Sequence, residues 1–245
     1  MSNKVNEYGA SQKRMNILRV TANEIKSFKL RRKICVTLLA AVVTLTALLY
    51  IAAALHRNMG RLSVGIAKDD MTRYGLTLSE TRDMKFCTSR LNAEINERIT
   101  NISRDDLPDN LSMIDGQHNG DNYIAYTFYL EHRGTDATDV EYAVTIKGVT
   151  LGLDAAMRVR LYIEDEYVEY AKTRDDGTGP EPYSTEFYSI DTVTTGILED
   201  YAPGDKTKFT IVIWLEGDDP ECVDRVIDGM ATVEMSFNAV IPEAE

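Results

Sequence analysis

Two acidic, glycine-containing loops contain the residue types that could support ligand chemistry. In the first, residues 115–122, the side chains of Asp115, Asn119 and Asp121 offer carboxylate and amide oxygens on a short turn. Ca²⁺ prefers about six to eight such oxygens from a flexible loop. The segment lacks the spacing and the closing Glu of an EF-hand, so two interpretations stay open: a calcium site at these three residues, or an Asx-type turn that leads into a strand at Tyr123.

The second acidic loop, residues 216–222, carries four carboxylates and a glycine and ends at Cys222. Its composition allows a metal site, or a turn in which the glycine relieves backbone strain. Cys87 and Cys222 are the cysteines outside the apolar segment described below, and an oxidising compartment would allow a disulfide between them. Because spacing in the sequence gives no Cα–Cα distance, bonded and free thiols both stay open.

The histidines form no recognisable catalytic or zinc-binding arrangement. None of His56, His118 and His132 belongs to a His-Glu-x-x-His motif, and the chain has no Gly-x-Ser-x-Gly, Walker or paired-glycine dinucleotide motif. A serine or cysteine nucleophile needs a base within hydrogen-bond reach, which only His118 or His132 could supply. We therefore expect a non-enzymatic protein with no cofactor apart from the candidate calcium ion.

Residues 34–55 form an apolar segment of 22 positions without a charged residue, glycine or proline. At about 1.5 Å per residue, a helix of this length spans about 33 Å, which matches a hydrocarbon core of about 30 Å. We predict a transmembrane helix that is retained as an anchor. The alternative is a cleaved signal peptide, with Ala52 and Ala54 as small residues for the peptidase, although the segment exceeds the usual apolar core of about 7–15 residues.

Charge is distributed unequally on the two sides of this segment. Residues 1–33 contain nine Lys or Arg against two Glu, a net charge of +7, whereas residues 56–245 contain 18 basic and 37 acidic residues, a net charge of −19. Basic residues beside a span stay in the cytoplasm, so we predict a single-pass protein of the cell membrane with a cytoplasmic tail at 1–33 and an extracellular C-terminal domain. The negative charge of that domain argues against nucleic acid as a partner.

The remaining sequence alternates apolar and polar residues with the period of two expected of half-buried strands. The alternation is found at residues 123–130, 140–146, 159–163, 167–170, 209–215 and 233–241. All six prolines fall outside these runs, and a turn at residues 133–136 predicts a hairpin between the first two. We predict a spacer at 56–75 and one domain at 76–245, a mainly β, antiparallel two-sheet sandwich of jelly-roll type.

One segment departs from this alternation. Leu91, Ile95, Ile99 and Ile102 recur at roughly helical spacing, with charged residues between them. A short helix packed on the sandwich is one interpretation, and a partner-binding helix is the other. Residues 154–156 predict a further helical turn.

Several strand and turn sequences together resemble a group of Gram-positive surface proteins, the relatives of TasA and camelysin. The segments that carry the resemblance lie at residues 75–80, 121–130, 134–135, 156–160, 202–205 and 212–222. The resemblance implies an exported β-sandwich that serves as a surface or matrix component, since TasA-like members assemble into fibres by donating a strand between subunits. The long basic tail and the retained anchor depart from that pattern. Without a zinc-binding histidine pair, the metallopeptidase activity attributed to camelysin is not implied.

These observations lead to hypotheses from different functional classes. The leading hypothesis is a non-enzymatic, membrane-anchored surface or matrix structural protein that associates with itself or with a protein partner through its outer domain. The alternative is a membrane-anchored binding or sensing module that recognises a cation or a protein partner. An extracellular hydrolase ranks third.

Overall fold

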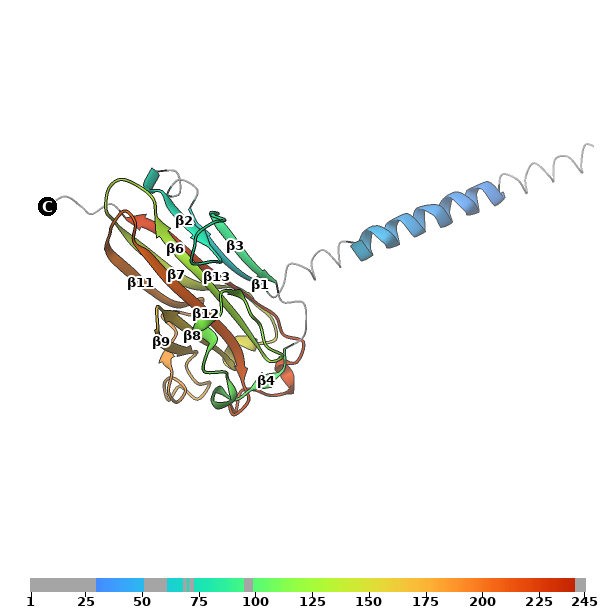
Figure 1. Cartoon of the computed structure of the whole chain (residues 1–245). Coiled ribbons are helices and arrows are strands. Elements are labelled where there is room, and N and C mark those ends of the chain that lie inside the picture. Colours follow the sequence, from blue (N-terminus) through green and yellow to red (C-terminus); the bar gives the residue numbers. More distant parts are fainter. Residues whose placement is uncertain (1–29, 51–60, 68–69, 71–72, 95–98, 241–245) are drawn as a thin grey trace, which may run out of the picture. The chain divides into compact units, whose positions relative to one another are not determined.

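The computed structural model describes residues 30–50, 61–67, 70, 73–94 and 99–240, which belong to two compact units. The first unit contains an N-terminal helix, and the second contains a β-sandwich (Figure 1). The predicted fold class, mainly β in two sheets and preceded by one apolar helix, is confirmed.

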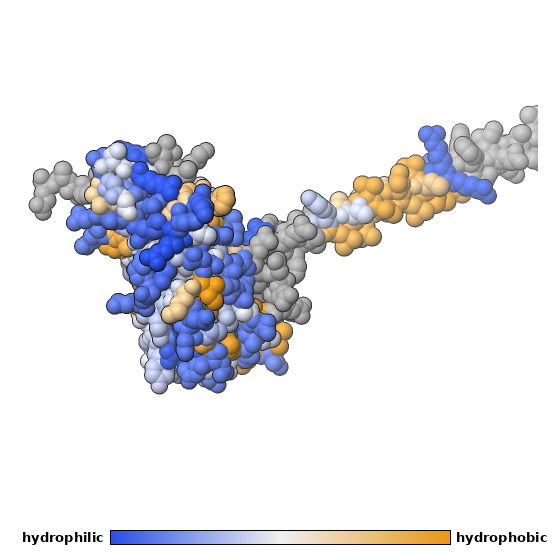
Figure 2. Space-filling view, in the orientation of Figure 1, coloured by the Kyte–Doolittle hydropathy of each residue, from blue (hydrophilic) through white to orange (hydrophobic). Residues whose placement is uncertain are grey.

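The helix spans Leu30–Tyr50 and is long and apolar enough to cross a membrane. Its side chains are exposed throughout, and the visible surface is apolar along most of its length after the basic first turn (Figure 2). The hydroxyls of Thr37, Thr44 and Thr46 each donate a 2.9 Å hydrogen bond to the carbonyl oxygen three residues earlier. These internal partners satisfy the hydroxyls without water, as a hydrocarbon environment requires. The last part of the predicted transmembrane segment, residues 51–55, lies outside the residues that the structure describes.

Two sheets and four short 3₁₀ helices make up the second unit. The five-stranded sheet has the order β11 (Thr192–Tyr201), β7 (Thr138–Val149), β13 (Ala231–Val240), β1 (Arg61–Ile66) and β3 (Arg90–Glu94). The eight-stranded sheet has the order β10 (Thr185–Glu186), β9 (Glu166–Ala171), β8 (Met157–Ile163), β12 (Lys206–Glu216), β6 (Tyr123–His132) and β2 (Leu76–Ser79), with β4 (Asn101–Ile102) on β12 and β5 (Gly116–Gln117) on β6. The 3₁₀ helices are η1 (Arg104–Asp106), η2 (Leu111–Met113), η3 (Leu153–Ala155) and η4 (Asp224–Val226).

Side chains from the inner faces of both sheets form one core. Phe128 and Phe209 stack with ring centroids 5.6 Å apart, and Phe237 of the opposite sheet packs edge-on against Phe209 at 5.1 Å. All three rings are fully buried. Burying one such side chain contributes about 1.5–3 kcal/mol, so the alternation along each strand determines which face meets the other sheet.

A second, smaller core lies on the outer face of β12. Val212 and Trp214 are fully buried there and pack with Leu107 and Leu111, which belong to the segment between β4 and β5. The Trp214 indole nitrogen donates a 3.0 Å hydrogen bond to Glu216 Oε2. Since both faces of β12 are covered, the strand is buried without a break from Phe209 to Trp214, in contrast to a strand with one solvated face.

The predicted spacer at 56–75 is wrong for residues 61–66. These residues form β1, which pairs in parallel with β13 and antiparallel with β3. Leu62 and Val64 are fully buried in the core. The apolar residues at 62, 64 and 66 follow the same period of two as the other strands, so the folded domain begins before residue 76.

The predicted hairpin across residues 133–136 is wrong as well, although both of its strands exist. β6 pairs with β12 and β2, whereas β7 pairs with β11 and β13 of the other sheet. The connection therefore crosses from one layer to the other. Two half-buried strands can share a core from opposite sheets as readily as from one sheet, so alternation alone does not specify pairing.

The predicted helix in residues 91–102 is extended where the structure describes it. Leu91 lies in β3 and Ile102 lies in β4, while Ile95 lies outside the described residues. Residues four apart share a face of a strand as well as a face of a helix, which explains the error. The helical turn predicted at 154–156 is confirmed as η3. The pairs β1–β13, β4–β12 and β9–β10 are parallel, so the sandwich is largely but not wholly antiparallel.

Candidate functional site

An open groove lies between the two sheets on the side formed by β9 and β11. Its volume is about 350 Å³, and its lining comes from strands β7, β8 and β9: Tyr142, Leu161, Ile163, Glu166, Tyr167, Val168 and Tyr170. Val168 lies directly opposite the buried Leu161 and so faces the other sheet, yet 44% of its surface is exposed. The sandwich is therefore not closed along this side.

Tyr142 forms one wall of the groove because of a glycine on the neighbouring edge strand. Gly196 of β11 is the ladder partner of Tyr142, and a Cβ at this position would overlap the phenol ring. The missing side chain lets the ring lie across the edge strand. The groove thus depends on a residue that adds no side chain of its own.

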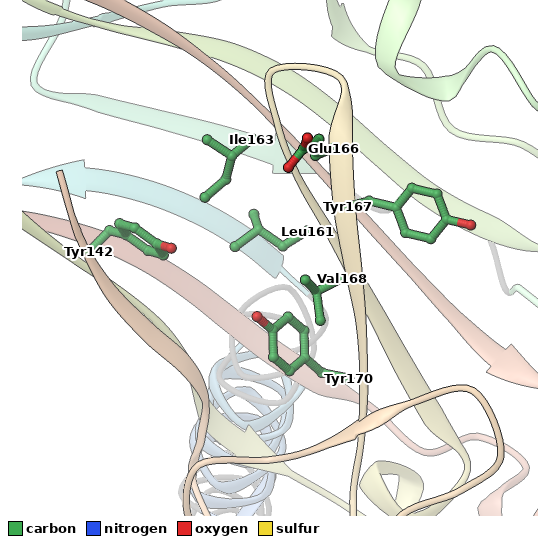
Figure 3. A pocket seen from close by; sticks show the side chains of 7 residues that line it. All are labelled: Tyr142, Leu161, Ile163, Glu166, Tyr167, Val168 and Tyr170. Carbon is green, nitrogen blue, oxygen red and sulfur yellow. The ribbon is translucent and has the colours of Figure 1, made fainter.

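The polar groups of the groove are two phenols and one carboxylate. Figure 3 shows Tyr142, Glu166 and Tyr170 around the space between the sheets, while Tyr167 points away from it. The Tyr170 hydroxyl accepts a 3.1 Å hydrogen bond from Thr194 Oγ1, which ties β9 to β11 across the groove. Burial, with a further electrostatic contribution from Tyr170, raises the pKa of Tyr142, so the Tyr142 phenol is neutral near pH 7.

The edge of β9 beside the groove has no partner strand over most of its length. β10 pairs only with Tyr170 and Ala171, and the Ala171 carbonyl accepts a hydrogen bond from Phe187 on the side away from β8. Backbone direction alternates along a strand, so the N–H and C=O of Tyr167 also point away from β8. Within the described part of the chain, no strand is registered against them.

A network of buried arginines and carboxylates lies at the far end of β8 and β12. Arg158 is ion-paired with Asp219, and its Nη2 lies 3.7 Å from Glu181 Oε2. Arg174 Nε lies 3.2 Å from Glu181 Oε1. Glu221 completes a group of three carboxylates whose oxygens lie within 4.8 Å of one another, the one such acidic group in the described residues.

The charges of this network are nearly balanced within the chain. A hydrogen bond with Asp219, together with burial, raises the pKa of Glu221 to about 7, so the two carboxyl groups share a proton in mildly acidic solution. Two guanidinium groups and this proton offset the three carboxylates. The sequence left a metal site and a turn open for residues 216–222, and the structure describes a turn that is held by ion pairs.

The residues predicted to bind calcium lie beside strand β6, and two of them accept hydrogen bonds from it. Asp115 Oδ1 accepts a 2.7 Å hydrogen bond from the Tyr129 hydroxyl, and Asn119 Oδ1 accepts a 3.1 Å hydrogen bond from the Ala125 N–H. Asp121 lies near Tyr123, whose pKa is raised by burial and by this carboxylate. These contacts are those of a turn that leads into β6, and calcium binding there stays a prediction.

The disulfide between Cys87 and Cys222 is not formed. Cys87 Sγ donates a 3.1 Å hydrogen bond to the Met84 carbonyl, which Arg133 also contacts, whereas Cys222 Sγ accepts a 3.7 Å hydrogen bond from Asn101. Arg133 follows the strand end that pairs with the start of β12, and Asn101 pairs with the end of β12. The thiols therefore lie at opposite ends of a strand about 30 Å long, far beyond the limit of about 7 Å between bridged Cα atoms.

The two histidines in the described residues, His118 and His132, both form hydrogen bonds with backbone groups. His118 lies between the carbonyl oxygens of Gly116, 2.9 Å from Nδ1, and Leu111, 2.8 Å from Nε2. His132 is fully buried, and its Nδ1 accepts a 3.1 Å hydrogen bond from the Gly134 N–H. Neither ring hydrogen-bonds to a serine or cysteine among the described residues.

Comparison with known proteins adds no family. No protein-family model matches the chain, and no characterised protein matches it in sequence. One similar solved structure is the β-glucosidase from Kluyveromyces marxianus in complex with glucose, which is 12% identical with a TM-score of 0.27 over 69% of this chain. The match spans only 16% of that enzyme, and a likeness of this size carries no argument about function.

Proposed function

We propose that this protein is a non-enzymatic, membrane-anchored structural protein of the cell surface. The helix at Leu30–Tyr50 carries the proposal, because it is apolar on all sides and satisfies its own threonine hydroxyls. A helix without a polar face is suited to lipid rather than to water. The basic residues at its start favour a cytoplasmic N-terminus and an extracellular sandwich.

A surface or matrix role is supported by the character of the second unit. It is a two-sheet sandwich with a large aromatic core and a strong negative charge, and it resembles the TasA and camelysin proteins over residues 75–240. Exposed strand edges provide backbone donors and acceptors through which such a domain associates with itself or with other proteins.

Location and assembly are tested separately. An epitope after residue 245 should be accessible to antibody and protease on intact cells, while an epitope at residue 1 should need permeabilisation. The mass of the membrane-bound chain distinguishes a retained anchor from a cleaved signal peptide. A C-terminal epitope found only in the cytosol contradicts the surface location, and a strictly monomeric full-length protein at high concentration contradicts a matrix role.

The groove between β9 and β11 favours a second candidate function, a membrane-anchored binding module. Its volume of about 350 Å³ falls in the range of about 300–1,000 Å³ that is usual for ligand sites, and Val168 at its floor is left exposed. A protein that bound no partner there would gain stability by closing the sandwich over these side chains. Ligand binding at the groove, measured on the full-length protein, distinguishes this function from a purely structural one.

A further inference from the structure

We propose that the groove between β9 and β11 binds an organic cation with an apolar stem, namely the alkylammonium group of a free amine or of a lysine side chain. The inference rests on the second function proposed above and names its ligand class. Four features of the groove support this inference: an apolar floor, a carboxylate without an ion-pair partner, two phenols, and a strand edge without a partner strand.

The floor of the groove accepts an apolar stem. Leu161 and Ile163 of β8 and Val168 of β9 lie on the face turned toward the other sheet, and Tyr142 closes the space from that sheet (Figure 3). Removing such a surface from water is favourable in proportion to the apolar area covered. A ligand that is charged along its whole length would not remove this apolar surface from water favourably.

The charge of the groove selects the sign of the ligand. Glu166 is the one carboxylate of the lining, which contains no lysine, arginine or histidine, and no lysine or arginine among the described residues forms an ion pair with Glu166. The adjacent Asp165 is already paired, at 3.0 Å, with Lys208. Because the net charge of residues 56–245 is −19, the surrounding field also attracts cations and repels anions.

The two phenols suit an ammonium group. Tyr170 accepts a hydrogen bond from Thr194, and Tyr142 has no hydrogen-bond partner for its hydroxyl in the described part of the chain. Phenol oxygens accept from an ammonium group, and aromatic ring faces attract cations with apolar bodies. On a lysine-bearing segment, the free N–H and C=O of Tyr167 offer the backbone an additional site.

The test uses full-length protein in nanodiscs of zwitterionic lipid, with empty nanodiscs as the reference. n-Butylammonium and Nα-acetyl-lysine N-methylamide are titrated with detection by saturation-transfer NMR, and 1-butanol and butyrate serve as the neutral and anionic analogues. We expect both ammonium probes to bind more tightly than either analogue. Glu166→Gln should weaken ammonium binding by about tenfold or more, the factor expected when a charge-assisted hydrogen bond is lost.

A matched charge variant controls for the overall field. Asp109→Asn removes the same charge from an exposed position in the segment between η1 and η2, and it should leave binding unchanged. Gly196→Ala keeps every charge but displaces Tyr142 toward the groove, and it should weaken binding. The fluorescence of Trp214, the only tryptophan in the chain, confirms that each variant is folded.

The outcomes separate the inference from the functions on which it rests. Binding of butylammonium alone identifies a free amine as the ligand, and binding of the lysine derivative identifies a protein partner. Equal binding of butanol or butyrate, binding that Glu166→Gln leaves intact, or no binding at all overturns the inference. None of these results changes the epitope accessibility that tests the surface location, and binding of any probe that Gly196→Ala abolishes preserves the binding module.

Discussion

The phenol ring of Tyr142 covers Gly196, the residue directly opposite it on the edge strand β11. A methyl group on Gly196 would meet the ring, so Gly196→Ala should destabilise the sandwich by about 1–3 kcal/mol, the usual cost of overpacking. Urea unfolding followed by the fluorescence of Trp214 measures the change. Gly148→Ala in β7 is the matched control, because its Cβ would meet nothing within 4 Å, and its effect should stay within about 0.5 kcal/mol.

Substitution in the buried pair of Arg158 and Asp219 should lower the unfolding free energy by more than Gly196→Ala does. Both side chains are almost fully buried, so Asp219→Ala removes the nearer partner of Arg158 and leaves Glu181, 3.7 Å away, as its remaining carboxylate; the loss should reach up to about 3–5 kcal/mol of unfolding free energy. Asp165 is 90% exposed in its pair with Lys208, and Asp165→Ala should cost no more than about 1 kcal/mol. Equal effects of the two substitutions would show that the Arg158 network is solvated.

Glu221 predicts a dependence of stability on pH. Its pKa in the folded protein is about 7, raised from an ordinary value of 4.5, so the folded state binds the proton more tightly than the unfolded state. The resulting stabilisation is complete below about pH 4.5 and is lost as the pH rises through 7. Glu221→Gln stays neutral, so the variant should gain stability relative to the parent protein between pH 5 and pH 8. A constant difference over this range contradicts the assignment, and Glu199→Gln on exposed β11 is the control.

The central position of β1 is tested by a cavity substitution. Leu62 is fully buried, and Leu62→Ala should cost about 2–5 kcal/mol. Arg61→Ala, at the exposed start of the same strand, should leave the unfolding midpoint nearly unchanged. A small effect at Leu62 would support the spacer that the sequence first suggested for these residues.

The two thiols of the β-sandwich, Cys87 and Cys222, should react at different rates. Cys87 is exposed, whereas burial raises the pKa of the Cys222 thiol, so iodoacetamide should modify Cys87 faster than Cys222 in the absence of a reducing agent. Peptide mass mapping assigns the two rates. Recovery of a Cys87–Cys222 linked peptide from the folded, unreduced protein would contradict the separation of the two sites.

Local alternation was sufficient to predict the strands at the centre of each sheet. β6, β8, β12 and β13 contain long runs of period two, because each has a face in the main core. β1 has only three apolar residues and lies a few positions after the apolar segment, so the sequence predicts a spacer at this position. β11 was missed because an edge strand with threonines, Gly196 and two carboxylates has no continuous apolar face.

Pairing and the groove could not be predicted in the same way. Whether residues 133–137 form a hairpin or cross between sheets depends on contacts of β6 and β7 with distant strands. The groove joins Tyr142 and Tyr170, which belong to different sheets and show no shared motif in the sequence. Arg158 likewise gains its significance from burial, and Glu166 from its neighbours in the groove, and only the tertiary fold supplies either.

The parallel pairing of β1 with β13 joins the first strand of the sandwich to its last, with Arg61 opposite Thr232. If the domain is exported as proposed above, β1 leaves the membrane early and β13 only near the end of translocation. β1 therefore cannot pair with β13 until almost the entire polypeptide has emerged, and the five-stranded sheet is completed late. In the proposed surface location, maturation of this domain depends on complete translocation, and a chain stalled before residue 231 would stay incompletely folded and accessible to chaperones and proteases.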